Sequence, residues 1–362
     1  MKYKIEISLA EDSRIVKHLH CPYYHSNGKT DTVTFSPKCI VIEADRGKSY
    51  TEDDIFTNVQ NSLYNQMLKT LFYHYSVNGK NSAISHIKVT SEAQGQETEI
   101  AEKFFSESNQ PLPVVESPIS LDVNTLEMLM DETDAAYDLR VVIAHWMEAM
   151  GETNVRDKME SIWLAFERLC IYRRHRNRNE TPYVSISLME MAKALKVHGN
   201  MYPRALSLVS HMTYTDLRRL MWHDLIEETY KIHSNPYKPK ELDDFEKKYL
   251  NGFAKQFEDI RVVQLLYDTR KYVKDELNAI QEYANLKSLL EGKINAGVSC
   301  DADLLALLSC YYAYFLRIRL FHGHALMKCS IFDKQSDKMG VGMIEEILET
   351  LVAELINNFR SL

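Results

Sequence analysis

The amino-acid sequence predicts an α+β N-terminal module followed by an all-α helical bundle. Three observations lead to this prediction. The first hundred residues alternate apolar and polar side chains with period two in several places, as strands do. The stretch "SESNQPLPVVESPIS" then places three prolines among small polar residues. After it, glycine is sparse and apolar residues recur at helical spacing. We therefore expect a module at 1–108, a linker at 109–120 and a bundle at 121–362.

Strands are predicted at three places in the module. These are "KYKIEISL", "DTVTFSPKCIVIEAD" and "SAISHIKVTSE", which alternate or are rich in β-branched residues. Between the last two, the sequence predicts one helix that opens with Thr51 and an acidic first turn and closes near Gly79.

The bundle is expected to contain several long helices joined by shorter ones. The long segments are "NVRDKMESIWLAFERLCIYRRHR", "ELDDFEKKYLNGFAKQFEDIRVVQLLYDTRKYVKDELNAIQEYANLKSLLEG", "DADLLALLSCYYAYFLRIRLFHG" and "KMGVGMIEEILETLVAELINNF". The third is apolar nearly all round, so we expect it to lie buried in the bundle or at a subunit contact.

Composition narrows the class of protein. A net charge of -8 argues against nonspecific adhesion to nucleic acid over the whole surface, so a polyanion would need a local basic patch. No apolar run is long enough to cross a bilayer and the start lacks an apolar signal core, so we predict no membrane partner and a cytoplasmic location. Six scattered cysteines favour reduced thiols.

The stretch "LRIRLFHGHAL", residues 316–326, puts two arginines and two histidines into a very apolar part of the chain. Buried charge is costly unless it is paired or used. A histidine can take the proton of a ribose 2′-hydroxyl or protonate the leaving 5′-oxygen, and an arginine can stabilise the phosphate. On spacing alone, ion pairs of Arg317 and Arg319 with glutamates of a neighbouring helix are the simpler interpretation.

Arg317 and His322 are five positions apart, which places them roughly 140° apart on a straight helix. They share one cleft only if the helix deforms near Gly323, or if two copies meet across a two-fold axis. Arg319 and His322, three positions apart, would share a face.

One pattern near the end of this late helix resembles the signature of the HEPN superfamily (higher eukaryotes and prokaryotes nucleotide-binding). The pattern is an arginine, four to six intervening residues, a histidine and then a glycine. The segment "ESIWLAFERLCIY", residues 160–172, is similar to the Trp-aliphatic-Ala-Leu-Glu-aliphatic helix of the same domain, particularly in its ApeA-like branch. In that helix the matching residues are Trp163, Ala165, Phe166 and Glu167. The resemblance covers residues 121–362.

The resemblance implies a HEPN-like homodimer in which Arg317 and His322 of both copies line one cleft. It implies an endoribonuclease that cleaves RNA without metal or cofactor, by 2′-hydroxyl attack, and leaves cyclic phosphate ends. Many such domains are toxins or antiviral defence effectors, and the N-terminal module is then the part that would meet a protein partner or antitoxin. Other HEPN domains bind nucleotides or partners without cleaving, so a noncatalytic interaction protein is the rival hypothesis.

Two arginine–histidine pairs in this stretch fit the spacing of the signature, and each pair defines one register. Active members usually have a polar residue directly after the arginine, but Ile318 follows Arg317 here. Arg319 with His324 also leaves four intervening residues, although the glycine then precedes the histidine. We keep Arg319 and His324 as supporting residues or as the second register.

Two further groups are candidates for the same site. Glu167 lies in an otherwise apolar segment and is either the partner that orients one of these arginines or half of a structural salt bridge. The stretch "YRRHRNRN" holds Arg173, Arg174, Arg176 and Arg178, which could draw in an RNA backbone. Its structural interpretation is a solvated loop whose cations complement a helix C-terminus.

A metal site is not predicted. The stretch "HLHCPYYH" gathers His18, His20, Cys21 and His25, but no second ligand pair follows at finger-like spacing, so a strand with incidental histidines is the better interpretation. The chain also lacks a Walker loop, a GxGxxG and a GxSxG, which disfavours ATPase, dinucleotide-binding and serine-hydrolase activities.

Overall fold

The structure is a computed structural model that describes residues 1–23, 26–78, 83–106, 109–110, 119–178, 184–222, 225, 252–270, 281–321 and 340–362. These residues form two compact units. Unit 1 is Met1–Tyr172 with Val352–Leu362, and unit 2 is Arg173–Leu351.

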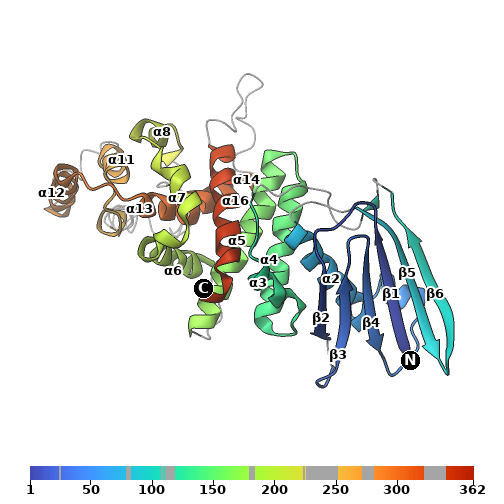
Figure 1. Cartoon of the computed structure of the whole chain (residues 1–362). Helices are drawn as coiled ribbons and strands as arrows, with labels where there is room; N and C mark the ends of the chain where they lie inside the picture. The colour runs from blue at the N-terminus through green and yellow to red at the C-terminus, as the bar shows by residue number, and fades with distance from the viewer. Residues whose placement is uncertain are drawn as a thin grey trace, which may run out of the picture. The chain divides into compact units, whose positions relative to one another are not determined.

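A mixed segment with β1 to β6 and the helices α1 and α2 comes first along the chain, and helices follow (Figure 1), as the sequence predicts. Unit 1 contains β1 (Lys2–Leu9), β2 (Lys17–Pro22), β3 (Thr30–Phe35), β4 (Cys39–Asp45), α1 (Glu52–Phe56), α2 (Ser62–Asn78), β5 (Ile84–Ala93), β6 (Gln96–Phe104), α3 (Val123–Leu126), η2 (Glu127–Met130), α4 (Asp134–Gly151) and η7 (Phe359–Ser361). Unit 2 contains α6 (Val184–Val197), η3 (Gly199–Met201), α7 (Pro203–Ser210), α8 (Tyr214–Arg218), α11 (Ile260–Arg270), α12 (Gln281–Ala296), α13 (Asp301–Ala306), η6 (Leu307–Tyr312) and α14 (Ala313–Phe321). Helices α5 (Val155–Arg178) and α16 (Val341–Asn357) each have residues in both units.

The six strands form one antiparallel sheet in the order β2-β3-β4-β1-β5-β6. Alternation along β1, β3 and β4 sends branched and aromatic side chains to one face and polar ones to the other. One row of the inner face crosses four neighbouring strands and is fully buried. It consists of Val33, Ile42, Ile5 and Val89.

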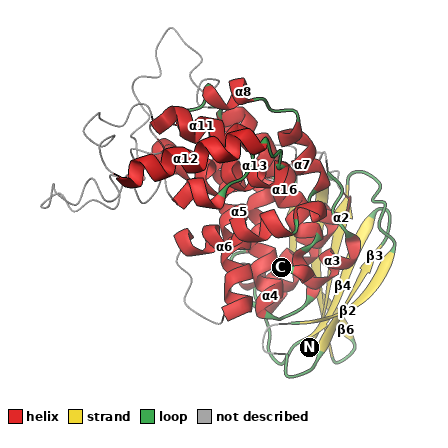
Figure 2. Cartoon of the chain, turned by 90° about the vertical axis from the view of Figure 1, so that its left-hand side faces the viewer, coloured by secondary structure: helices red, strands yellow, loops and turns green. Residues whose placement is uncertain are grey.

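Helix α2 lies against this inner face in both views (Figure 1, Figure 2). The ring of Tyr73 is 5.3 Å from that of Phe35 on β3. On its other side α2 packs against α3, η2 and α4. Unit 1 is therefore layered, with α2 between a sheet and further helices, and α2 buries even polar residues such as Gln66 and Thr70.

Lys69 joins these layers. Its buried ammonium group donates to the carbonyl oxygens of Pro22 (2.5 Å) and Met130 (3.1 Å) and to the carboxylate of Glu132 (2.6 Å). Burial lowers the pKa of Lys69, and the hydrogen bond to Glu132 opposes that change. Three acceptors satisfy the three N–H bonds, which makes a buried cation tolerable here.

A second buried charge pair lies at the same end of the sheet, where Asp31 is the register partner of Cys21, next to Pro22. The guanidinium of Arg46 donates to both carboxylate oxygens of Asp31 at 2.6 Å and to the hydroxyl of Ser62 at 2.8 Å. The ring of Tyr23 covers it at 3.6 Å. Burial raises the pKa of the Asp31 carboxyl, and the hydrogen bonds from Arg46 oppose that rise. The pair ties β3 and the end of β4 to the start of α2.

Some buried polar groups on α2 have no hydrogen-bond partner among the described residues, including both ring nitrogens of His74. His74 is fully buried, 6.5 Å from the ring of Phe35 and 5.6 Å from that of Tyr75. Burial lowers the pKa of His74 to about 4, so the imidazole is neutral at physiological pH.

The structure corrects the predicted elements of the module in two respects. The single helix expected from Thr51 is two helices, α1 and α2. The side chains of Asn58 and Asn61 accept backbone N–H groups between α1 and α2, which interrupts the helix there. The sheet has six strands where about three are predicted. The "DTVTFSPKCIVIEAD" segment is a hairpin of two strands around Pro37, and the polar strands β2 and β6 are additional.

The two compact units do not follow the predicted boundaries. Residues 111–118 of the predicted linker 109–120 lie outside the described part of the chain. Helices α3 and α4, which the sequence assigns to the bundle, belong to unit 1 because they pack on α2. The division between units falls after Tyr172, within α5.

Two further predictions concern thiols and membranes. The five cysteines in the described ranges are all free, and burial raises the pKa of Cys310 to about 12. None of the described helices is long and apolar enough to cross a bilayer.

We predict that Arg46→Met destabilises unit 1 by about 3–5 kcal/mol, because it leaves the buried Asp31 carboxylate without its partner. Lys4→Met is the matched control, since it removes a partly exposed pair with Glu6 and costs less than about 1 kcal/mol. Urea unfolding followed by the fluorescence of Trp146 and Trp163, in a Trp222→Phe background, measures both. Equal costs for the two variants would contradict the assignment of Arg46 as a buried anchor.

We predict that His74 makes unit 1 sensitive to acid. Its pKa is about 4 when folded and 6.5 as the reference value, so the unfolded chain binds the proton first. The free energy of unfolding therefore falls as pH drops from about 6.5 to 4, by on the order of 3 kcal/mol, and is unaffected above that window. Urea titrations at a series of pH values test this. His74→Phe should lose this part of the pH dependence, whereas His175→Gln, at an exposed histidine, should keep it.

Candidate functional site

The candidate arginines lie on a long buried helical segment. α13, η6 and α14 follow one another without interruption from Asp301 to Phe321. Nearly all apolar side chains from Leu304 to Leu316 are buried, as the sequence predicts. α13 packs on α6 and α7 of unit 2. A Cβ on Gly199 would stand 3.0 Å from the Ala302 side chain, so a glycine permits the close approach of η3.

The middle of this segment, η6, is a π-helical turn. The hydroxyl of Ser309 donates to the carbonyl of Leu305 at 2.7 Å. Two flanking tyrosines are held from outside the segment: Tyr312 Oη accepts from the backbone N–H of Met221 at 3.1 Å, and Gln256 Nε2 donates to Tyr311 Oη at 2.8 Å. A π turn inserts one residue, so every later side chain rotates by about 100° relative to a straight helix.

Arg317 and Arg319 follow the π turn on the regular helix α14, about 200° apart around its axis. Both are half-buried. The guanidinium carbon of Arg319 lies 5.1 Å from the centre of the Phe315 ring, one turn earlier. Arg317 makes no hydrogen bond or ion pair in the described part of the chain. The glutamate partner that the structural interpretation requires is therefore not observed for Arg317.

His322, Gly323 and His324 lie outside the described residues, so the geometry of either register stays a prediction. The deformation that is described precedes Arg317. The π turn changes the side of the helix from which Arg317 projects. It does not change the number of residues between Arg317 and His322.

An ionic network fixes the start of α13. The guanidinium of Arg261 donates to both oxygens of Asp259 (2.9 and 2.8 Å) and to Asp301 (2.6 Å). The fully buried carboxylate of Asp259 also accepts the backbone N–H of Cys300 at 2.7 Å. The hydrogen bonds to Asp259 and Asp301 raise the pKa of Arg261. The network joins the start of α11 to the residues that open α13.

Asp303 extends this anchor in an unexpected way. The residue before α13 is Cys300, and its side chain makes no capping bond. The buried carboxylate of Asp303 accepts backbone N–H groups of Glu258 and Asp259 and pairs with Lys196 at 3.0 Å. The aspartate thus caps the segment before α11 and not α13 itself.

The four arginines of the predicted basic patch differ in their surroundings. Arg174 is buried and pairs with Glu190 of α6 at 3.3 Å, which favours a structural role. Arg173 donates a long hydrogen bond to the carbonyl of the same Glu190. Arg176 is exposed, and the side chain of Arg178 lies outside the described part. Among the described side chains of the patch, Arg176 is the most exposed.

Glu167 has a partner in unit 1. Its carboxylate accepts the indole N–H of the buried Trp163, one turn earlier, at 2.7 Å. This bond satisfies the indole within the helix that resembles the HEPN motif. An ion pair of Glu167 with an arginine stays a prediction.

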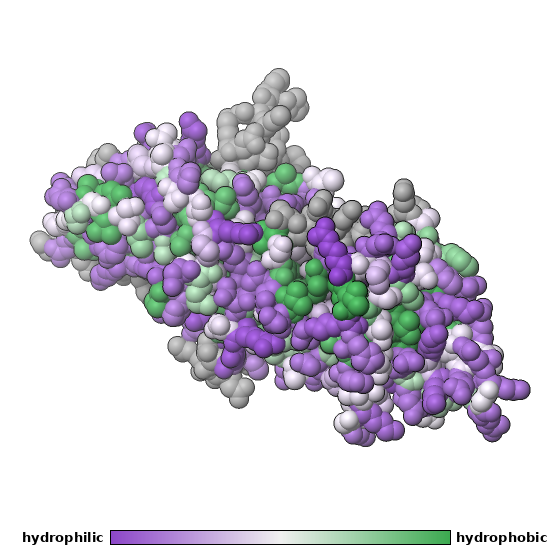
Figure 3. Space-filling model, in the orientation of Figure 1, coloured by the Kyte–Doolittle hydropathy of each residue, from purple (hydrophilic) through white to green (hydrophobic). Residues whose placement is uncertain are grey.

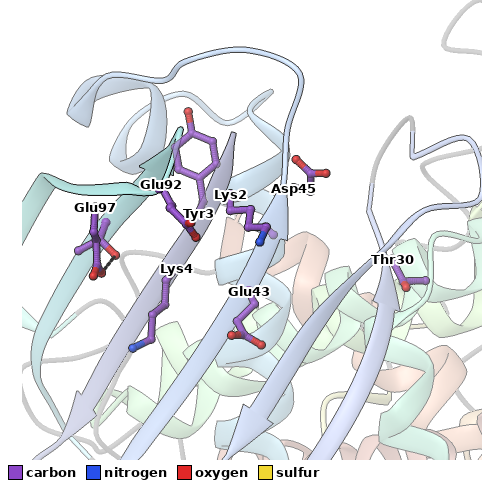
Figure 4. Close-up of a pocket in the computed structure, with 11 residues that line it drawn as sticks. Lys2, Tyr3, Lys4, Thr30, Glu43, Asp45, Glu92 and Glu97 are labelled. Atoms are coloured by element: carbon purple, nitrogen blue, oxygen red, sulfur yellow. Dashed lines mark hydrogen bonds between the residues drawn. The ribbon is translucent and has the colours of Figure 1, made fainter.

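An open hollow of about 630 Å³ lies on the outward face of the sheet (Figure 4). Lys2 and Lys4 of β1 stand among the carboxylates of neighbouring strands, which are Glu43, Asp45, Glu92 and Glu97. In the view of Figure 3, hydrophilic residues dominate the surface over the strands. Because carboxylates outnumber lysines there, the hollow does not suit RNA, and the end of α14 is the stronger candidate.

Comparisons with known proteins assign no function to the hollow or to the end of α14. No protein-family model matches the chain, and no curated protein or solved structure matches it.

We predict a large loss of stability for one arginine of unit 2 and almost none for another. Arg261→Met leaves the buried Asp259 carboxylate unpaired and should cost about 3–5 kcal/mol. Arg317→Met removes a half-buried cation that has no described carboxylate partner, so the free energy of unfolding should change by less than about 0.5 kcal/mol. Urea unfolding followed by Trp222, with Trp146 and Trp163 replaced by phenylalanine, measures both. A large loss in Arg317→Met would assign that residue a structural role.

Proposed function

We propose that the end of α14 belongs to a HEPN-like, metal-independent endoribonuclease site in which Arg317 binds the scissile phosphate. The observation that carries the proposal is the state of Arg317, which is half-buried, follows an anchored and π-bulged helix, and has no described protein partner. A guanidinium kept without a carboxylate is free to bind a phosphate through two parallel hydrogen bonds.

His322 is the proton-transfer residue in this proposal. A neutral imidazole takes the proton of the ribose 2′-hydroxyl, whose oxygen attacks phosphorus, and a proton is returned to the departing 5′-oxygen. The products are a 2′,3′-cyclic phosphate and a 5′-hydroxyl. Arg317 stabilises the negative charge that grows on the phosphoryl oxygens during this step. In a cell, such an activity suits a toxin or an antiviral defence effector.

A homodimer is part of the proposal because of the spacing of the two residues. Arg317 and His322 point about 140° apart if the helix continues straight, so a second copy related by a two-fold axis supplies the missing group. The exposed Arg176 supports the proposal as a contact for the RNA backbone.

We predict that the purified full-length chain cleaves total RNA in the presence of EDTA. Arg317→Ala should lower kcat/KM about 10²–10³-fold and His322→Ala about 10²–10⁴-fold, with cyclic phosphate ends on the products. Denaturing gels and end-group analysis measure both effects. Arg319→Ala and His324→Ala test the second register.

The matched control is Arg219→Ala, an exposed arginine just after α8 of unit 2, which should leave the cleavage rate unchanged. Intact RNA with the wild-type chain, or equal cleavage by wild type and His322→Ala, would sink the enzyme proposal and leave the noncatalytic interaction protein.

Mixing the two inactive variants tests the dimer separately. If Arg317 of one copy works with His322 of the other, each mixed dimer of Arg317→Ala and His322→Ala contains one complete site. Random exchange then restores about a quarter of the wild-type activity. No recovery in mixed dimers would place both residues of the working site on one chain.

A further inference from the structure

Two histidines project from the outward face of edge strand β2. His18 and His20 are two positions apart, so alternation puts them on the same face, and both are exposed. Cys21 points to the opposite face, where it is buried. Its position excludes the cysteine as a partner of the two imidazoles.

Each imidazole is held by a threonine across the sheet. His18 is paired with Thr34 of β3 and His20 with Thr32. The Nδ1 atom of His18 lies 2.9 Å from the hydroxyl of Thr34, and that of His20 lies 3.4 Å from the hydroxyl of Thr32. A hydroxyl can accept an N–H from Nδ1, which leaves the Nε2 lone pair of each ring available. Bonding of the second ring nitrogen is how proteins orient metal-binding histidines.

The separation of the rings fits one shared ion. The ring centres of His18 and His20 are 5.1 Å apart. Two imidazoles bound through nitrogen at about 2.0–2.1 Å to one tetrahedral ion have ring centres roughly 5 Å apart. The separation of the ring centres, with the ring planes at 88°, is thus that expected for two imidazoles on one ion.

The nearest charges on the sheet are mixed. Thr32 is paired on its other side with Glu43 of β4, and Lys4 of β1 stands opposite Glu43 and bonds Glu6 at 2.7 Å. One lysine against two carboxylates leaves a small excess of negative charge, which attracts a cation without binding it directly. No group of three or more metal-binding side chains gathers in the described ranges, so an ion here has two protein ligands and completes its shell with water.

We propose that His18 and His20 form a two-histidine site for a divalent transition-metal ion of the Zn²⁺, Ni²⁺ or Cu²⁺ class. Imidazole ligands select these ions over Mg²⁺ and Ca²⁺, which bind oxygen. The positions that water fills leave the ion able to take a further ligand from a partner or substrate. The site is in unit 1 and is independent of the arginines on α14.

Calorimetric titration of the EDTA-stripped, dialysed full-length chain with ZnCl₂ tests the site. We expect a binding event that weakens at least tenfold in His18→Ala and in His20→Ala, and less in Thr34→Val, which loses only the group that orients the ring. MgCl₂ should give no binding. Both histidines are exposed, so thermal unfolding of the metal-free variants should match that of wild type.

His86→Ala is the matched control, because His86 is on the outward face of the same sheet but bonds Glu102 at 2.8 Å. Its affinity for Zn²⁺ should equal that of wild type. Absence of Zn²⁺ binding in wild type, or unchanged affinity in the His18→Ala/His20→Ala double variant, would overturn the site. Cleavage of RNA in EDTA is a separate readout, so failure of either proposal leaves the other intact.

Discussion

The buried ammonium of Lys69 is the interaction on which the arrangement of unit 1 depends. It bonds the end of β2, the last residue of η2 and Glu132, so one side chain sets the distance between the sheet and the outer helices. With α2 held between two layers, its polar residues must be buried, and His74 is one of those without a hydrogen-bond partner among the described residues. The same arrangement covers one face of the sheet and leaves the outward face, with its paired histidines and carboxylates, for ligands.

In unit 2 the comparable constraint is the Asp259 carboxylate. It accepts bonds from Arg261 and from the backbone of Cys300, and so fixes where α13 begins relative to α11. Because the start of α13 is fixed, the directions of the later side chains depend on the helical geometry between α13 and α14. The π turn at Leu307–Tyr312 changes that geometry by one residue, and the bond between Tyr312 and Met221 accompanies it. The direction of Arg317 thus depends on contacts made well before it in the helix.

Sequence patterns predicted what depends on local periodicity. The alternation of Tyr3, Ile5 and Ile7 predicted β1, and the apolar run from Leu304 predicted a buried helix. β6 was missed because it is an edge strand with glutamates along most of its length, so its pairing with β5 leaves no hydrophobic pattern. The π turn, the capping by Asp303 and the pairing of Arg174 with Glu190 depend on residues distant in sequence, which single-sequence periodicity does not report. For the candidate site, the arginines and the buried helix were predictable, and the absence of a described partner for Arg317 was not.

The buried and half-buried cations of this chain fall into two classes, and the difference bears on function. Arg46, Arg174 and Arg261 each face a carboxylate, so their desolvation is offset within the protein. Arg317 receives no such offset from the described residues. A chain gains nothing in stability from a half-buried cation of this kind, and a methionine there would pack at no electrostatic cost. Residues that add nothing to stability are retained where they bind or catalyse, which supports the proposal that Arg317 binds a phosphate.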